Sequence, residues 1–215
     1  MKVLVIGASG AIGRAVTAEL LARGHTVTAA TRSGAPVEGL VVQAVTGDAS
    51  DPASVARLAA GQDAVASATG PRRGNGGEDP EDSMLGAARG LAEGLRRAGV
   101  RRLVVVGGAG SLEVAPGQRL VDAPGFPPAA KPTALAHAKA LHEVYRGIED
   151  LDWTYVSPAA VIGPGERTGE FRIGGDQLLL DASGESRISI PDFAIAVADE
   201  LEHGKAFRRR ITVAY

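Results

Sequence analysis

Short runs of apolar, often β-branched residues alternate along the chain with longer stretches of helical periodicity. The short runs predict strands at Val3–Ile6, Thr26–Ala30, Leu40–Val45, Ala64–Ser67, Leu103–Val106, Trp153–Ser157 and Ile211–Ala214. The longer stretches predict helices at Ile12–Ala22, Pro52–Ala60, Asp82–Ala98, Thr133–Gly147 and Asp192–Glu202. The early strands are continuously apolar, as expected for strands that are covered on both faces in a parallel sheet. The alternation therefore predicts a doubly wound α/β fold with a mainly parallel sheet and helices on both of its faces.

Three segments depart from this alternation. Gly70–Asp82 is rich in glycine and charge and predicts a mobile loop. Glu113–Pro132 carries five prolines and is not expected to form a helix, whereas Gly163–Ser189 predicts a hairpin around Ala-Ser-Gly. Each segment follows the carboxyl end of a strand, where doubly wound folds bind their ligands. We therefore expect a single domain over residues 1–215 with a small lid formed by 113–132 and 163–189; the alternative is that these segments are ordinary surface connections.

Composition narrows the range of partners. The 215 residues carry a net charge of -2, which gives no broad basic surface for nucleic acid, and there is no cysteine for disulfide or thiolate chemistry. The N-terminal apolar run is too short to span a membrane, and no histidine or carboxylate spacing indicates a metal. We expect a cytoplasmic protein with no metal, no membrane and no nucleic-acid partner, present as a monomer or a homodimer.

A glycine-rich turn lies between the first predicted strand and helix. Gly7 suits the tight turn out of the strand, Gly10 allows the backbone to approach a pyrophosphate, and Gly13 allows the helix to pack close to the sheet. The free N–H groups at the helix start, around Ala11 and Ile12, would face the phosphates, and the Ser9 hydroxyl adds a donor. A Rossmann-type dinucleotide site is the prediction; the alternative is a glycine turn with only a packing role.

Residues after the next strands refine the cofactor prediction. Arg32 follows the second strand, where an acidic residue would bind a ribose 2′-hydroxyl; its guanidinium suits a 2′-phosphate and favours NADP(H) over NAD(H). Asp48, followed by Ala49, is placed to accept a hydrogen bond from the adenine amino group, or else to cap the next helix. The small residues Ala68, Thr69 and Gly70 follow the fourth strand, where a ribose must pass.

Six stretches of the chain resemble the short-chain dehydrogenase/reductase superfamily in its atypical branch. They read "GASGAIG", "TR", "GDASDP", "VVVGGAGSL", "LDWTYVSPAAVIGPGERTGEFRIGGDQLL" and "SRISIPDFAIAVADELE". The similarity is greatest to the NAD(P)-binding group of NmrA-like proteins, biliverdin reductase B (a flavin reductase) and bacterial NADH-flavin reductase-like proteins. This resemblance implies an NADP-binding Rossmann fold and reduction of flavins or quinone-like acceptors.

The superfamily's general acid, a tyrosine in Tyr-x-x-x-Lys, is missing. None of the three tyrosines is followed by lysine at that spacing, and the alignment puts Leu135 in the tyrosine's place and Lys139 in the lysine's. Reduction of a ketone needs a proton on the developing alkoxide, which a positioned acid accelerates about 100-fold or more. Reduction of a flavin spreads charge into the ring, so a protein acid matters less there. The missing tyrosine thus favours a flavin or quinone-like acceptor.

Several polar groups are candidates for the remaining chemistry. Ser111 lies near the superfamily's catalytic Ser/Thr position or is a turn residue, and Lys139 bonds the nicotinamide ribose or is a solvated helix lysine. His137 has the side-chain type for proton delivery, although most helical histidines are surface residues. By resemblance, Pro158, Ala159 and Ala160 meet the nicotinamide, with the Ala160 amide offered to the carboxamide.

Three functional hypotheses follow. The first is an NADPH-dependent oxidoreductase that transfers hydride to a flavin or quinone-like acceptor, with a bound flavin as a possible substrate. The second, from NmrA-like relatives, is a non-catalytic NADP(H)-binding sensor that regulates a partner. The third is an isomerase or dehydratase that retains its cofactor.

Overall fold

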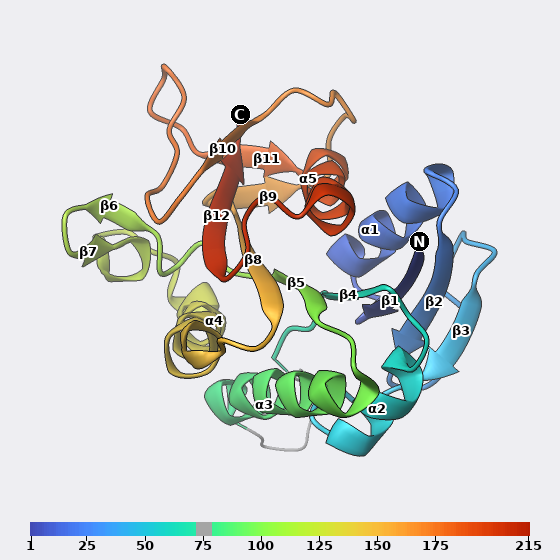
Figure 1. Ribbon diagram of the computed structural model, residues 1–215. Coiled ribbons are helices and arrows are strands. Elements are labelled where there is room, and N and C mark those ends of the chain that lie inside the picture. The colour runs from blue at the N-terminus through green and yellow to red at the C-terminus, as the bar shows by residue number, and fades with distance from the viewer. Residues whose placement is uncertain (72–78) are drawn as a thin grey trace.

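The computed structural model describes residues 1–71 and 79–215. Its centre is a sheet whose strands lie in the order β10 (Arg172–Gly174), β12 (Arg209–Ala214), β8 (Asp152–Pro158), β5 (Arg102–Val106), β4 (Ala64–Ser67), β1 (Lys2–Ile6), β2 (Thr26–Thr31) and β3 (Gln43–Thr46). All neighbours pair in parallel except β10, which runs antiparallel to β12. The chain order reverses between β1 and β4, the place where doubly wound folds bind ligands (Figure 1).

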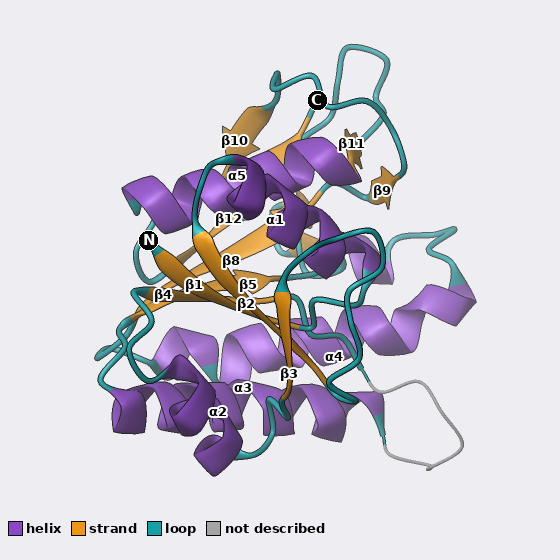
Figure 2. Cartoon of the chain, turned by 90° about the vertical axis from the view of Figure 1, so that its right-hand side faces the viewer, coloured by secondary structure: helices purple, strands orange, loops and turns teal. Residues whose placement is uncertain are grey.

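Helices cover both faces of the sheet. α1 (Ala11–Ala22) and α5 (Ile190–His203) lie on one face, and α2 (Pro52–Ala59), α3 (Pro80–Ala98) and α4 (Lys131–Glu143) lie on the other (Figure 2). Two apolar clusters result, one on each side of the strands. β1, β4 and β5 are buried nearly throughout, which confirms the doubly wound, mainly parallel fold expected from their continuous apolar runs.

The ends of several elements differ from the sequence prediction. α3 begins at Pro80 rather than Asp82, because the Asp79 carboxylate accepts the Glu81 N–H at 2.7 Å and caps the helix. β3 begins only at Gln43, where pairing with β2 starts; Val41, in the predicted first part of this strand, is fully exposed. α4 ends at Glu143 and is followed by a 3₁₀ turn over Tyr145–Gly147.

The proline-rich segment 113–132 contains short regular elements. It forms a small antiparallel pair, β6 (Glu113–Ala115) and β7 (Gln118–Arg119), followed by 3₁₀ turns at Leu120–Asp122 and Pro128–Ala130. The expectation of no helix is wrong at its end, because α4 already begins at Lys131 with Pro132 in its first turn. Proline is tolerated there, since the first N–H groups of a helix have no intrahelical partner.

The hairpin predicted within 163–189 does not form as a strand pair. The Asp181 carboxylate and backbone close a tight turn with Glu185, but the flanking strands pair elsewhere. β10 joins the main sheet, and β11 (Arg187–Ser189) pairs in parallel with β9 (Val161–Gly163). Of the segment Gly70–Asp82, residues 72–78 lie outside the described part of the chain, so the expected loop is not described there.

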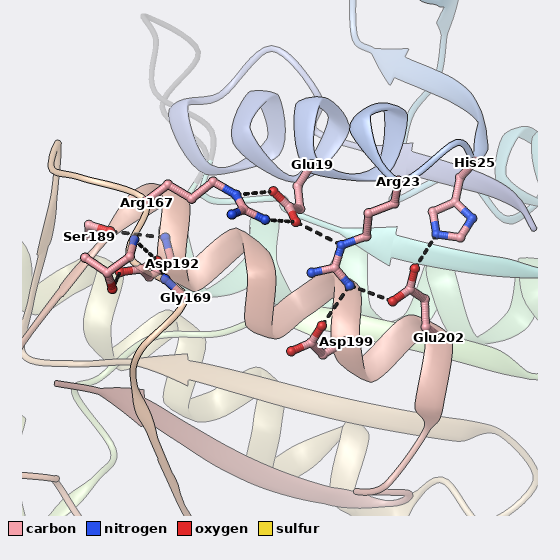
Figure 3. A network of polar contacts seen from close by, with 10 residues as sticks. Glu19, Arg23, His25, Arg167, Gly169, Ser189, Asp192, Asp199 and Glu202 are labelled. Carbon is pink, nitrogen blue, oxygen red and sulfur yellow. Dashed lines mark hydrogen bonds and ion pairs between the residues drawn. The ribbon is translucent and has the colours of Figure 1, made fainter.

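A polar network fastens α1 to α5 and to segment 163–189 (Figure 3). The buried Glu19 carboxylate on α1 accepts hydrogen bonds from Arg23 and Arg167, and Arg23 also bonds Asp199 and Glu202 of α5 at 2.7 and 2.5 Å. These charged contacts fix the position of helices whose remaining interface is apolar.

A second anchor lies at the start of α5. The buried Asp192 carboxylate accepts the backbone N–H groups of Thr168 and Gly169, each at 2.8 Å, and the Tyr215 hydroxyl at 2.8 Å. The Ser189 hydroxyl accepts the Asp192 N–H at 3.1 Å and donates to the Glu166 carbonyl at 2.7 Å. Segment 163–189 is thus tied to the helix at its first turn.

In residues 1–71 and 79–215 there is no helix with both the length and the apolar composition needed to cross a membrane.

Candidate functional site: a nucleotide pocket at the β1–β4 switch point

The turn after β1 has the geometry of a phosphate cradle. Gly7 adopts a positive φ of 84°, and a Cβ there would lie 2.5 Å from the Ala68 carbonyl oxygen. A Cβ on Gly13 would lie 2.1 Å from the Gly7 carbonyl oxygen, so both positions require glycine for packing. Gly10 differs, because its nearest atom would be at 3.5 Å and the residue lines an open pocket.

The start of α1 supplies donors for an anion. Gly10 is the N-cap residue and has no side chain to accept the first N–H groups, and the first turn holds no acidic residue. The N–H groups of Ala11, Ile12 and Gly13 therefore keep their hydrogen-bonding capacity and the positive end of the helix dipole. This is the arrangement that binds pyrophosphate in dinucleotide folds.

A pocket of about 240 Å³ opens beside this turn. Nine of the predicted cofactor residues line it: Gly7, Ser9, Gly10, Arg32, Asp48, Ala49, Ala68, Thr69 and Gly70. Residues that the sequence analysis missed complete the lining, namely Ile6, Ala30, Thr31, Gly47, Ser50, Pro71, Ser83 and Ala87. Ser83 and Ala87 come from α3. No sequence motif marked these two positions as part of a nucleotide pocket.

Arg32 also lines an adjoining pocket, together with Arg57 of α2. Thr46, Gly47, Asp48 and Ser54 form the rest of its wall. Both arginines are exposed, and the Arg57 guanidinium contacts the Ser54 hydroxyl at 3.5 Å. The sequence analysis did not predict a second cation beside Arg32, because Arg57 lies within a predicted helix and matches no motif.

Asp48 holds its own turn together. Its carboxylate accepts the Ser50 N–H at 2.9 Å and the Ser50 hydroxyl at 2.7 Å, while Asp51 caps α2 by accepting the Ala53 N–H at 2.9 Å. The helix-cap alternative for Asp48 is therefore wrong, and Asp48 lies in the pocket wall as a turn residue.

Two of the three candidate catalytic residues are buried and bonded within the fold. The Ser111 hydroxyl accepts a hydrogen bond from Arg210 at 2.8 Å. His137 packs beneath Gly108, and the Tyr155 hydroxyl donates to its backbone carbonyl at 3.0 Å. Burial lowers the pKa of His137 to about 4, so the expectation of a pKa suited to proton delivery is wrong for this residue.

Lys139 is paired rather than free. Its ammonium lies 2.8 Å from the Glu81 carboxylate of α3, and each side chain is about one-third exposed (36%). The hydrogen bond to Glu81 raises the pKa of Lys139. A contact with a nicotinamide ribose would therefore have to compete with this ion pair.

Pro158 ends β8, and Ala159 and Ala160 follow it. Pro158 and Ala159 are buried, and the Ala160 N–H donates to the Ser186 hydroxyl at 3.1 Å. That amide is therefore not available to a carboxamide in this conformation, which corrects the role expected for it. None of these three residues lines the described pocket.

The three tyrosines are buried or bonded within the fold. Tyr145 and Tyr155 are fully buried on the α4 side of the sheet, where burial raises the pKa of each hydroxyl, and Tyr215 is bonded to Asp192. All three tyrosines of the chain lie in its described part. Each of these three hydroxyl groups is thus either buried or hydrogen-bonded within the fold.

One group of possible metal ligands occurs in the described residues: Asp199, Glu202 and His203, at the end of α5. Both carboxylates are ion-paired with Arg23, and the His203 Nδ1 contacts the Asp199 carbonyl at 3.1 Å. These contacts account for the cluster within the fold.

Fold and pocket together define a Rossmann-type nucleotide-binding protein, and comparison with known proteins gives its family. Residues 7–201 match the model of the NAD(P)H-binding family, and the chain belongs to that family. This confirms the resemblance to atypical short-chain dehydrogenase/reductase and NmrA-like proteins.

Relatives extend over the whole chain. The chain is 40% identical to the protein YwnB of Bacillus subtilis (strain 168), over 99% of this chain and 98% of that one. Among solved structures, a candidate exported protein from Burkholderia pseudomallei is 50% identical with a TM-score of 0.89, and each chain is covered completely. A candidate NADH-flavin reductase from Streptococcus pneumoniae TIGR4 is 33% identical with a TM-score of 0.82, over 100% of this chain and 99% of that one.

Proposed function

We propose that the protein is an NADPH-dependent reductase that passes hydride to a flavin or quinone-like acceptor without a tyrosine proton donor. The observation that carries the proposal is the pair of arginines, Arg32 and Arg57, that line a pocket next to the nucleotide pocket. The family, and the reductase description of the Streptococcus pneumoniae relative, support the reaction class.

Nucleotide binding follows from the cradle. The open space at Gly10 and the free N–H groups at the start of α1 suit a pyrophosphate. Arg32 and Arg57 suit a 2′-phosphate on the adenosine ribose, since guanidinium groups bind phosphate through paired, charge-assisted hydrogen bonds. When bound, the reduced nicotinamide supplies the hydride.

The nature of the acceptor follows from the proton donors that are lacking. In the described part of the chain, His137 is neutral and buried, Tyr145 and Tyr155 are buried, Tyr215 is bonded to Asp192, and Ser111 is bonded to Arg210. An acceptor ring that spreads negative charge can take its proton from solvent, so the protein need only bind and orient the two rings.

An activity assay tests the proposal. Purified protein is mixed with NADPH and riboflavin, FMN or a small quinone, and absorbance of the reduced nicotinamide is followed. We expect acceptor-dependent oxidation above the rate without protein. Tight NADPH binding without oxidation of any acceptor would instead favour the NADP(H)-sensor hypothesis.

The preference for NADPH is tested at Arg57. Arg57→Gln removes one charged hydrogen-bond donor to phosphate and is expected to weaken NADPH binding about tenfold, whereas NADH, which lacks the 2′-phosphate, is bound as before. Arg32→Gln is expected to act in the same direction. Calorimetry gives both affinities, and Arg97→Gln, at the far end of α3, is the matched control. An equal change for NADPH and NADH would contradict the assignment.

The proposal includes a cytoplasmic location, where a soluble pool of reduced nucleotide is available. The Burkholderia relative is described as exported, so fractionation of cells that express the chain is the direct test.

A further inference from the structure

A third hollow lies between the first turns of α3 and α4. It is open to solvent, has a volume of about 380 Å³ and is lined by Asp79, Pro80, Glu81, Pro128, Lys131, Pro132 and Leu135. α3 connects it to the nucleotide pocket, because Ser83, one turn after Pro80, lines that pocket. Figures 1 and 2 show α3 and α4 side by side on the same face of the sheet.

The wall of this hollow is apolar and rigid. Pro80, Pro128 and Pro132 have fixed backbone φ and present ring carbons, and Leu135 adds a half-exposed aliphatic side chain. Leu135 is the residue that the resemblance puts in the place of the missing proton donor. A flat ring can therefore pack against carbon at the position where a carbonyl substrate would meet a hydroxyl.

The two carboxylates that line the hollow already have partners in the fold, whereas its lysine has no ion-pair partner in the described chain. The Glu81 carboxylate is paired with Lys139 at 2.8 Å, and the Asp79 carboxylate caps α3. Lys131 is exposed and forms no ion pair within 4.0 Å in residues 1–71 and 79–215. Lys131 interacts electrostatically with the Asp122 carboxylate, but this carboxylate is already paired with Arg119 at 2.7 Å.

We propose that this hollow is the acceptor site, and that it takes an acceptor with a flat apolar ring and an anionic substituent. The ring lies against Leu135 and the prolines, and the anionic group lies at Lys131, where the N-terminal end of α4 adds to the positive potential. The inference rests on the proposed reductase function. The ring gains a hydride, with its two electrons, from the reduced nicotinamide and a proton from solvent, and the anionic group takes no part in the reaction.

Two flavins that differ by one phosphate separate the two parts of the inference. Binding of FMN and of riboflavin is measured by quenching of flavin fluorescence in the presence of NADP⁺, so that no turnover is needed. Lys131→Met is expected to weaken FMN binding about fivefold, the range of an exposed ion pair, and to leave riboflavin binding unchanged. Lys205→Met, at an exposed lysine after α5, is the control and is expected to change neither.

Leu135→Trp tests the apolar wall. The larger side chain fills the hollow from a half-exposed helix position, so both flavins are expected to bind at least tenfold more weakly while NADPH affinity by calorimetry is retained. Circular dichroism and thermal unfolding establish that each variant is folded.

The outcomes distinguish this site from the proposed function. Lys131-dependent FMN binding in a protein that oxidises no NADPH would support the hollow and refute the reductase. NADPH oxidation with flavin affinities unchanged in Lys131→Met and Leu135→Trp would support the reductase and refute the hollow. An equal loss of FMN and riboflavin in Lys131→Met would refute the anionic part of the inference.

Discussion

The three glycines of the β1–α1 turn differ in how much space surrounds them. Gly7 and Gly13 have no room for a Cβ, because the Ala68 and Gly7 carbonyl oxygens lie within 2.5 Å of where it would be. At Gly10 a Cβ meets only an ordinary contact at 3.5 Å and would extend into the pocket. The sequence motif treats these positions alike, whereas in the structure two of them are required by close packing and the third lies in the open wall of the pocket.

Alanine variants distinguish a glycine that is needed for nucleotide binding from one that is needed for packing. Gly10→Ala is expected to keep the thermal unfolding midpoint within a few degrees and to weaken NADPH binding at least tenfold, because the methyl group occupies the phosphate's space. Gly13→Ala is expected to destabilise the fold by about 2 kcal/mol or more, through overpacking against the Gly7 carbonyl. Calorimetry and thermal unfolding give both quantities. Strong nucleotide binding by Gly10→Ala would contradict a phosphate at this turn.

At the scale of elements, the two predicted lid segments are joined to each other. Glu113 of β6 forms an isolated bridge with Gln177, and its backbone bonds Asp176 and Leu178 at 2.9 Å each. Arg210 of β12, whose side chain is 3% exposed, binds the Asp176 carboxylate and the Ser111 hydroxyl. The loop after β5 and segment 163–189 therefore share one buried cation.

Arg210→Lys tests this coupling. Lysine keeps the charge but cannot bond Ser111 and Asp176 together through a planar fork, so we expect faster amide hydrogen exchange in both 113–119 and 172–180. Nucleotide affinity is expected to stay the same, because the pocket is lined by other elements. Arg209→Lys, at the exposed neighbouring position, is the matched control. Faster exchange in only one of the two segments would show that Arg210 does not couple them.

At the scale of the whole molecule, buried titratable groups on both faces of the sheet make stability depend on pH. Burial lowers the pKa of His137 from 6.5 to about 4, so the unfolded chain takes up a proton that the folded chain does not as pH falls over this range. His142, on the same helix, is exposed; partial desolvation and the charge of Arg146 lower its pKa as well. On the opposite face, the hydrogen bond from Arg167 lowers the pKa of Glu19, and hydrogen bonds from Gly169, Thr168 and Tyr215 outweigh burial to lower that of Asp192.

Loss of stability in acid is therefore expected in two stages. The first lies between about pH 6.5 and 4, from the histidines, with His137 contributing on the order of 3 kcal/mol at most. The second lies below the ordinary carboxyl values of 4.5 and 3.8, as Glu19 and Asp192 become protonated. His137→Gln is expected to flatten the first stage in plots of unfolding midpoint against pH, and His203→Gln, at an exposed position, to leave it as in the parent. An unchanged slope in His137→Gln would contradict the role of this residue.

The nucleotide-binding half was largely predictable because its signals are local. Gly7, Gly10 and Arg32 follow directly from strands whose apolar runs are unbroken, and each lines the pocket. The contributions of Arg57 and Ser83 were not predictable, because they depend on where α2 and α3 come to rest on the sheet.

The second half was less predictable because its contacts are between distant residues. β10 pairs with β12 instead of with its neighbour in sequence, and Ser111 meets Arg210 across 99 positions. The sequence showed that Leu135 replaces the expected tyrosine, but it did not predict that prolines from other segments lie around this residue.

The linings of the three hollows divide almost cleanly along the chain. Every residue around the nucleotide and its adjoining pocket lies between Ile6 and Ala87, whereas Lys131 and Leu135 belong to a stretch that contributes nothing there. In the reductase proposed above, the residues that select the coenzyme and those that select the acceptor thus belong to separate stretches of the chain that meet only on α3. A chimera that exchanges the chain before or after that helix with a relative is therefore expected to take its coenzyme preference from one parent and its acceptor preference from the other.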